Sequence, residues 1–244
     1  MVTPERHILA TSGGWTGPST GPYRARPGPL LTYGLELTGK QRPKLCFLTT
    51  AGGDNNAEIA MGYNAFASRD DVAVSHLELF VMPNVHDPRE HLLSQDMIWV
   101  GGGSVANLLA VWRAHGLDTI MREAWEAGIV LAGVSAGSIC WHVGGTTDSF
   151  GLDLRAVTDG LALVPYSNGV HYDSEERRRP LFHRLIGDGT LPAGFATDDG
   201  VGLHYVGTDF REALSERKNA AAYWVERTAD GVDESEISPR LLPE

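Results

Sequence analysis

Short apolar runs that end in consecutive glycines are the feature that most constrains the fold of this chain. The runs at 7–11, 44–50 and 97–100 are each followed within one residue by two or three glycines in a row. Helix-length patterns separate these runs, and such alternation indicates β-α-β units and a mostly parallel sheet. Loops after the carboxyl ends of parallel strands form the ligand crevice. Residues far apart in the sequence are therefore expected to meet at one edge of the sheet.

Apolar periodicity predicts the individual elements. Ser104 is the expected N-cap of one helix. We expect a single three-layer α/β domain over residues 1–229, with helices on both faces of the sheet, and a polar, frayed tail over residues 230–244. The expected strands span 7–11, 44–50, 72–79, 97–100, 129–132, 201–206 and 220–225, and the expected helices span 55–69, 105–115 and 117–127.

Composition excludes several classes of partner. The chain has 244 residues, of which 42% are hydrophobic, so it can bury a sizeable core. A net charge of −11 argues against binding to nucleic acid or to an anionic membrane surface. No apolar run reaches about 18 residues, and the first residues lack a signal-peptide core, so a cytoplasmic protein is expected. Cys46 and Cys140 lie in apolar stretches, and no metal-binding motif is present, so we expect no metal and no cofactor.

Ser135 lies at the centre of Gly133-Val134-Ser135-Ala136-Gly137. The pattern Gly-x-Ser-x-Gly arises by chance in glycine-rich chains, and this chain has 29 glycines. Here, however, an apolar strand pattern precedes it and a helix pattern follows it, as in a nucleophile elbow. Small residues on both sides allow the tight turn that holds the hydroxyl outward. The context therefore favours a catalytic serine.

A serine nucleophile needs a base and an orienting carboxylate. Of the nine histidines, His171 has the most suitable setting, between an apolar segment and a charged stretch. His204 lies in a strand pattern, which is more typical of packing or of a solvent-facing position. His142 is close to the serine in sequence, but the backbone direction of the elbow helix is expected to carry it away. Two acids could orient the imidazole: Asp148, in a polar loop after the elbow helix, and Asp198, in the acidic turn 197–200. Each is also a residue that turns favour for their own geometry.

An oxyanion hole requires two N–H donors aimed at one point. The Ala136 N–H follows the serine directly, and Gly102 or Gly103 could supply the second donor. The same glycines could instead form only a tight turn, or a phosphate loop, although no lysine or G-x-G-x-x-G fingerprint supports nucleotide binding. A charged run over 175–179 contains Arg178 and Arg179, either of which could bind a substrate carboxylate. The alternative is a solvated helix start.

Three segments together resemble the peptidase E (aspartyl dipeptidase) and cyanophycinase family of serine peptidases. They are the loop 100–104 followed by Asn107-Leu108-Leu109, the elbow 132–138 and the segment 169–173. The resemblance covers about residues 7–225 and implies a fold like that of class I glutamine amidotransferases. It further implies hydrolysis of short peptides, which include dipeptides with an N-terminal aspartate in peptidase E. A small peptide is the expected partner, and a monomer or homodimer the expected state.

The resemblance also assigns roles to residues. Ser135 is the implied nucleophile and His171 the implied general base. Asp148 matches the third member in peptidase E, after the elbow helix. Asp198 lies near the position of the cyanophycinase glutamate, after the histidine, and both remain candidates.

Two other functions remain open. A glutamine-amidotransferase-like activity would use a cysteine at the elbow, but Cys140 lies five residues beyond Ser135. A non-catalytic binding domain of the same fold would leave Ser135 unreactive toward serine-directed phosphonates.

Overall fold

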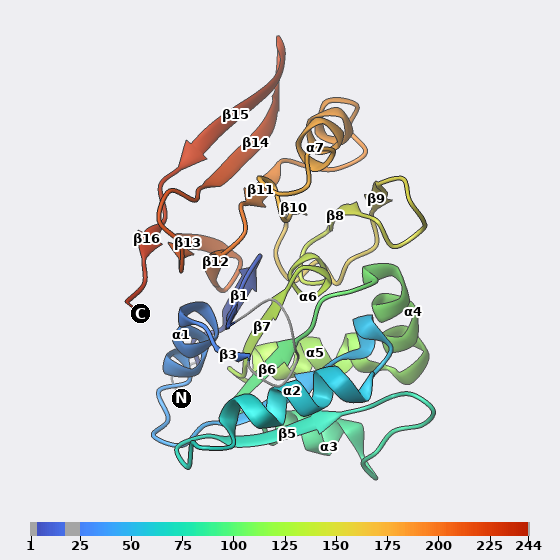
Figure 1. Ribbon diagram of the computed structural model, residues 1–244. Helices are drawn as coiled ribbons and strands as arrows, with labels where there is room; N and C mark the ends of the chain where they lie inside the picture. The colour runs from blue at the N-terminus through green and yellow to red at the C-terminus, as the bar shows by residue number, and fades with distance from the viewer. Residues whose placement is uncertain (1–3, 18–24, 244) are drawn as a thin grey trace.

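The computed structural model describes residues 4–17 and 25–243, and its larger sheet has eight strands in the order β16-β13-β12-β1-β7-β6-β4-β5 (Figure 1). Five consecutive strands, from β1 to β5 in this order, are parallel, whereas β12 runs antiparallel to β1 and β13 antiparallel to β12. The predicted α/β class with a mostly parallel sheet is confirmed. The strands are β1 (His7–Thr11), β4 (Lys44–Leu48), β5 (Ala73–Leu77), β6 (Met97–Val100), β7 (Val130–Val134), β12 (Val201–Val206), β13 (Asp209–Ser215) and β16 (Arg240–Leu241).

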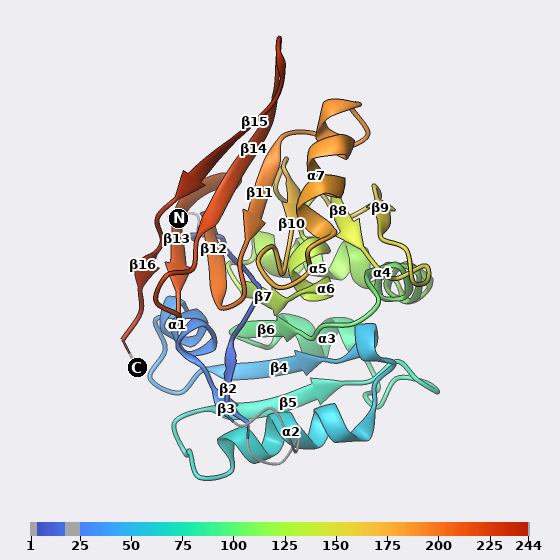
Figure 2. The same ribbon diagram turned by 45° about the horizontal axis from the view of Figure 1, so that its top comes forward.

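Helices cover both faces of this sheet, as the alternation of its side chains requires. Leu9 and Trp99 point to one apolar cluster, which includes α1 and α2. Ile8 and Ile98 point to the other, which includes α3, α4 and α5. Figure 2 shows α2 lying along β4 and β5. The helices span α1 (Pro29–Leu37), α2 (Asn56–Phe66), α3 (Pro88–Leu93), α4 (Val105–His115) and α5 (Leu117–Glu126), with a 3₁₀ turn η2 (Thr50–Gly52).

A second, six-stranded sheet in the order β15-β14-β11-β10-β8-β9 was not predicted. Its central strands β8, β10 and β11 are parallel and only three or four residues long. They are rich in Gly, Ser, Thr and Asn, so they lack the apolar signal of the first sheet. Helix α7 (Arg178–Gly187) packs on this sheet. The strands are β8 (Gly144–Thr147), β9 (Arg155–Val157), β10 (Ser167–Gly169), β11 (Gly194–Thr197), β14 (Ala222–Thr228) and β15 (Gly231–Ile237).

The segment after residue 229 differs from the expected frayed tail. Strand β15 pairs antiparallel with all of β14, through a turn in which Gly231 has a φ of 139°. Its main chain gains ladder hydrogen bonds, and Glu234 on it accepts hydrogen bonds from Tyr172 Oη and His183 Nε2 at 2.9 and 2.8 Å. A polar sequence therefore stays ordered because its backbone completes the sheet.

Strands β2 (Trp15–Thr16) and β3 (Arg26–Pro27) form a two-stranded sheet. Within residues 4–17 and 25–243, no helix has the length and apolar character that a membrane crossing needs.

Candidate active site

Ser135 occupies a sharp turn between β7 and α6 (Ala136–Ile139). Its φ of 57° and ψ of −110° are values that a residue with a side chain adopts rarely. The Ser135 N–H donates to Thr11 O at 3.0 Å, and the Ser135 carbonyl accepts from Ser138 N and Ile139 N at 2.9 Å each. These bonds hold the strained turn in place. The local geometry is that of the predicted strand–turn–helix elbow.

The two glycines of the motif permit the close approach of this turn to β6. A Cβ added to Gly133 would lie 2.7 Å from Val100 O, and one added to Gly137 would lie 2.8 Å from Val100 C. Both separations are too short for atoms that are not bonded to each other. The motif therefore places Ser135 tightly against the end of the neighbouring strand.

His171 lies just beyond β10, on the second sheet, and also has a positive φ, 55°. Its N–H donates to Ser12 Oγ at 3.2 Å. Its ring nitrogen Nδ1 is 2.6 Å from Asp199 Oδ1. An ionised carboxylate only accepts hydrogen bonds, so Nδ1 carries the proton in this pair and Nε2 is left as the acceptor. That is the tautomer that a general base for a hydroxyl needs.

Asp199 is fixed by contacts of its own main chain. Its N–H donates to Asp173 Oδ1 at 2.8 Å, and its carbonyl accepts from Arg217 Nη1 at 3.0 Å. Arg217 Nη2 also reaches Asp173 Oδ2, at 3.2 Å. The loop that carries Asp199 is therefore braced by an ion pair from both sides.

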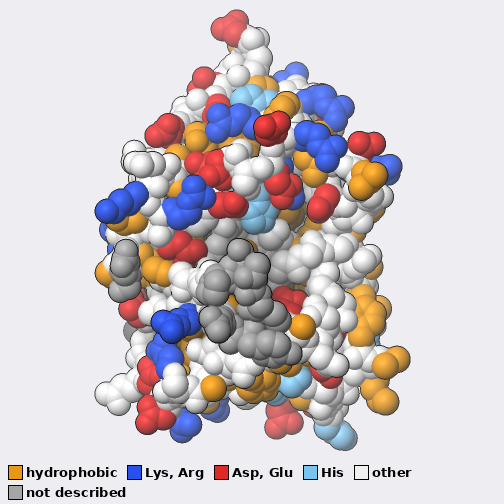
Figure 3. Space-filling view, viewed as in Figure 1, with side chains coloured by type: hydrophobic (Ala, Val, Ile, Leu, Met, Phe, Trp, Pro, Cys, Tyr) orange, Lys and Arg blue, Asp and Glu red, His pale blue; other side chains and the backbone are white. Residues whose placement is uncertain are grey.

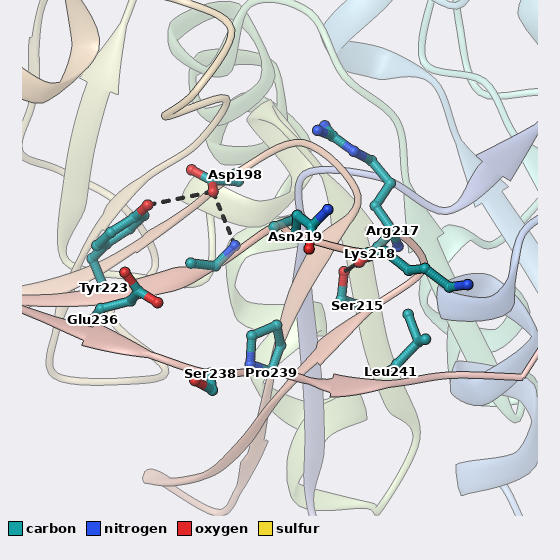
Figure 4. A pocket seen from close by; sticks show the side chains of 12 residues that line it. Asp198, Ser215, Arg217, Lys218, Asn219, Tyr223, Glu236, Ser238, Pro239 and Leu241 are labelled. Carbon is teal, nitrogen blue, oxygen red and sulfur yellow. Dashed lines mark hydrogen bonds between the residues drawn. The ribbon is translucent and has the colours of Figure 1, made fainter.

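The carboxylate beside His171 is thus neither of the two that sequence reasoning selected. Asp198 is buried and points elsewhere: its Oδ2 accepts from Ala221 N at 2.9 Å and Tyr223 Oη at 3.4 Å (Figure 4). Burial raises the pKa of Asp198. Asp148 is exposed in the turn after β8. Adjacent residues in the turn 197–200 face different directions, and the sequence gives no sign of which one meets the imidazole.

Ser135 and His171 come from different sheets, and both are attached at the end of β1. Their backbones are anchored to consecutive residues, Thr11 and Ser12. Ser12 Oγ also lies 2.7 Å from Thr197 Oγ1, next to the acidic turn. Among the described residues, the hydrogen bond of the His171 ring is the one to Asp199, and none joins it to Ser135 Oγ. Catalytic hydrogen bonds are often long before substrate binds.

Two of the predicted oxyanion donors, Gly102 and Ala136, lie beside the serine. A Cβ added to Gly102 would be 3.4 Å from Ser135 Cβ and 3.9 Å from its Oγ. Within the described part of the chain, the N–H groups of Gly102, Gly103 and Ala136 have no acceptor. Gly103, with a φ of 128°, turns against Ala51. Free N–H groups beside the serine hydroxyl are what a developing oxyanion requires.

The two arginines of the charged run differ in their surroundings. Arg178 is buried, and its guanidinium donates to Glu175 Oε2 at 2.8 Å and to Thr146 O at 2.5 Å. These internal bonds give it a structural role, contrary to the predicted substrate contact. Arg179 is half-exposed and lies over the rings of Tyr172 and Tyr223, 4.7 and 4.5 Å from their centroids.

The electrostatic surroundings of the site are mixed. On the face shown in Figure 3, Lys and Arg side chains alternate with Asp and Glu over the upper half of the molecule.

His142, on the far side of the elbow helix, is buried between Ser138 O and Tyr205 Oη, and burial lowers its pKa to about 4. Among residues 4–17 and 25–243, no three His, Cys, Asp or Glu side chains are grouped as a metal ion would need.

Comparison with known proteins points to one family. The model described as "Peptidase family S51" matches residues 19–213. The uncharacterized peptidase YgaJ of Bacillus subtilis is 43% identical over 193 residues, which cover 79% of this chain and 82% of the relative. Peptidase E of Shewanella denitrificans is 25% identical over 206 residues, covering 75% and 81%. The crystal structure of a peptidase from an acI-B1 Actinobacterium has a TM-score of 0.69 at 16% identity, covering 97% and 96%, and shares the fold.

Proposed function

Because the chain belongs to peptidase family S51, we propose that this serine-type peptidase hydrolyses short peptides through a triad of Ser135, His171 and Asp199. The main support for this triad is the 2.6 Å contact between His171 Nδ1 and Asp199 Oδ1. The backbone of His171 is anchored to Ser12, next to the residue that anchors Ser135. Asp199 takes the role for which Asp148 and Asp198 were the candidates from sequence.

The proposed mechanism is acyl transfer to water. Ser135 Oγ attacks the peptide carbonyl carbon while His171 Nε2 accepts the hydroxyl proton. Asp199 holds the ring and stabilises the imidazolium. The N–H groups of Ala136 and Gly102 donate to the oxyanion of the tetrahedral intermediate. His171 then gives its proton to the leaving amine, and a water molecule, activated by the same ring, releases the acid and restores Ser135.

The proposed substrates are dipeptides and other short peptides, including those with an N-terminal aspartate. Two cations near His171 support recognition of a substrate carboxylate. Arg179 lies over the ring of Tyr172, the residue after the base, and Arg217 contacts the loop of Asp199. The Arg179 guanidinium pairs with Glu234 Oε1 at 3.4 Å but stays half-exposed, whereas Arg178 is buried against Glu175 and Thr146.

The proposal is tested with a dipeptide library and the variant Ser135→Ala. The wild type should hydrolyse a subset of the library, and the variant should lose on the order of 10⁴–10⁶ in kcat because the nucleophile is gone. A serine-reactive phosphonate should label the wild type, with the adduct mapped to Ser135 by mass spectrometry. Hydrolysis that survives in the variant, or a protein that neither cleaves peptides nor accepts the label, would overturn the proposal.

A further inference from the structure

The elbow helix α6 follows Ser135 directly and is only four residues long, Ala136–Ile139. A single helical turn is not stable by itself, so contacts with the rest of the molecule must fix its position. In Figure 1, α6 lies between β7 of the first sheet and β10 of the second, and it contacts both strands. These are the strands that lead to Ser135 and to His171.

Ser138, on α6, is hydrogen-bonded to the strand that carries the base. Its Oγ donates to Asn168 Oδ1 at 2.8 Å, and Asn168 Nδ2 donates to Phe195 O at 3.2 Å. Ser138 N donates to Ser135 O at 2.9 Å. Asn168 lies on β10, three residues before His171. The Ser138–Asn168 bond therefore connects the turn of the nucleophile with the strand of the base.

The main chain of Ser138 is linked to the first sheet through His142. Ser138 O is 2.9 Å from His142 Nδ1, and His142 Nε2 is 3.1 Å from Tyr205 Oη, on β12. A carbonyl oxygen only accepts, so Nδ1 carries the ring proton and Nε2 accepts from the tyrosine hydroxyl. One residue of the elbow helix is thus tied to the second sheet by its hydroxyl and to the first sheet by its carbonyl.

These bonds lie in the apolar core, which also contains Ile139 and Phe195. Buried polar groups cost stability unless they are paired, and an apolar pair of the same shape would pack there at little or no cost. A fully paired polar network, however, allows only one arrangement, because any shift breaks bonds where no water can replace them. Four side chains of the network are fully buried: Ser138, His142, Asn168 and Tyr205.

We propose that this buried network sets the separation of Ser135 Oγ and His171, and that Ser138 and Asn168 are positioning residues for the triad. The inference rests on the proposed peptidase function. Ser138 acts through the carbonyl of Ser135, and Asn168 acts through the strand that leads to His171. Without their bond, α6 could move relative to β10 while the backbones of Ser135 and His171 stay anchored to β1. Proton transfer is sensitive to such a displacement.

The test is Ser138→Ala, which removes one hydroxyl group. We expect kcat to fall about 10- to 100-fold per folded molecule, because a displacement of about 1 Å has an effect of this size. KM should stay within about twofold of the wild type, since the residues proposed to bind substrate are unchanged. Tyr205→Phe removes the hydroxyl at the other end of the network and should also lower kcat more than KM.

Ser167→Ala is the matched control. Ser167 is also fully buried and adjoins Asn168 on β10, but its hydroxyl donates to Pro192 O at 2.6 Å rather than to α6. Both serine variants lose one buried hydrogen bond, so their urea midpoints should fall by similar amounts. The Ser167→Ala variant should nevertheless keep the kcat of the wild type per folded molecule.

Labelling of Ser135 by a serine-reactive phosphonate gives a second measurement that needs no peptide. Its rate should fall about 10- to 100-fold in Ser138→Ala and stay unchanged in Ser167→Ala, since His171 must activate Ser135 here too. Wild-type kcat in both Ser138→Ala and Tyr205→Phe would overturn the positioning role. Equal losses of kcat in Ser138→Ala and Ser167→Ala would overturn it as well. Peptide hydrolysis that persists in Ser135→Ala would instead overturn the proposed function on which the inference rests.

Discussion

At this site, the partner of each polar residue depends on the direction in which its side chain points. Asp198 and Asp199 are neighbours of the same type, yet one accepts from Ala221 and Tyr223 and the other from His171. Arg178 and Arg179 form a second such pair, one internal and one half-exposed. Residue type and spacing therefore narrow the candidate site residues to two adjacent positions. The local backbone decides which of the two side chains faces the proposed site.

The titration of Glu58, a half-buried acid in the first turn of α2, makes a prediction for stability. Its pKa is raised in the folded protein, to about 7, so between pH 4.5 and 7 the folded state holds more proton than the unfolded state. The contribution of Glu58 to stability is therefore fully present at low pH and is lost as the pH rises through about 7. His142 acts in the opposite direction: its pKa is lowered to about 4, so its contribution is present above pH 6.5 and is lost as the pH falls.

Removing the Glu58 carboxylate should thus leave the pH dependence of stability that comes from His142 unopposed. Urea unfolding of Glu58→Gln is expected to show a free energy of unfolding that rises more steeply from pH 4.5 to 7 than in the wild type. Glu90→Gln, at an exposed first-turn acid of α3, is the matched control and should follow the wild type. Parallel pH profiles for Glu58→Gln and the wild type would contradict the burial that the structure gives to this carboxylate.

At the scale of elements, the elbow depends on contact between α6 and β6. Gly137→Ala would bring a Cβ against the main chain of Val100 and push the helix start away. We expect destabilisation of about 1–3 kcal/mol and a loss of at least about 100-fold in kcat/KM, since a shift of about 1 Å near the nucleophile has that effect. Circular dichroism and peptide assays would measure both.

A second glycine variant isolates the effect of the elbow. Gly39→Ala has open space around the new Cβ and only an unfavourable φ, 63°. It should lose some stability while keeping full activity per folded molecule. If Gly137→Ala retained wild-type activity, the tight packing of the elbow would not be what positions Ser135.

The elements also differ in how well the sequence reveals them. The strand at 97–100 and the helix at 105–115 were predicted at the observed bounds, because fully apolar runs and a Ser cap leave few alternatives. Strands β8 and β10 were missed, since three or four Gly, Thr, Ser and Asn residues carry no period. Strand β15 was missed because its stability comes from pairing with β14, a long-range property.

At the scale of the molecule, the proposed site forms where two sheets meet. The first sheet supplies Ser135 and the Gly102 loop, and the second supplies His171. Asp199 lies in the turn that leads from β11 to β12, and so from one sheet to the other. Sequence reasoning selected Ser135, His171 and the Gly102 loop as candidates because each follows a strand. It did not select Asp199, whose place beside His171 depends on how the two sheets are joined.

The central claim is that Asp199, rather than its neighbour, orients His171 for Ser135. Steady-state kinetics of Asp199→Asn and Asp198→Asn on the best peptide of the library tests it most directly. We predict that Asp199→Asn lowers kcat on the order of 10³–10⁴-fold with the fold intact, because the imidazole loses its tautomer. Asp198→Asn should stay within about tenfold of wild type per folded molecule. The reverse order, or two equal losses, would contradict the account.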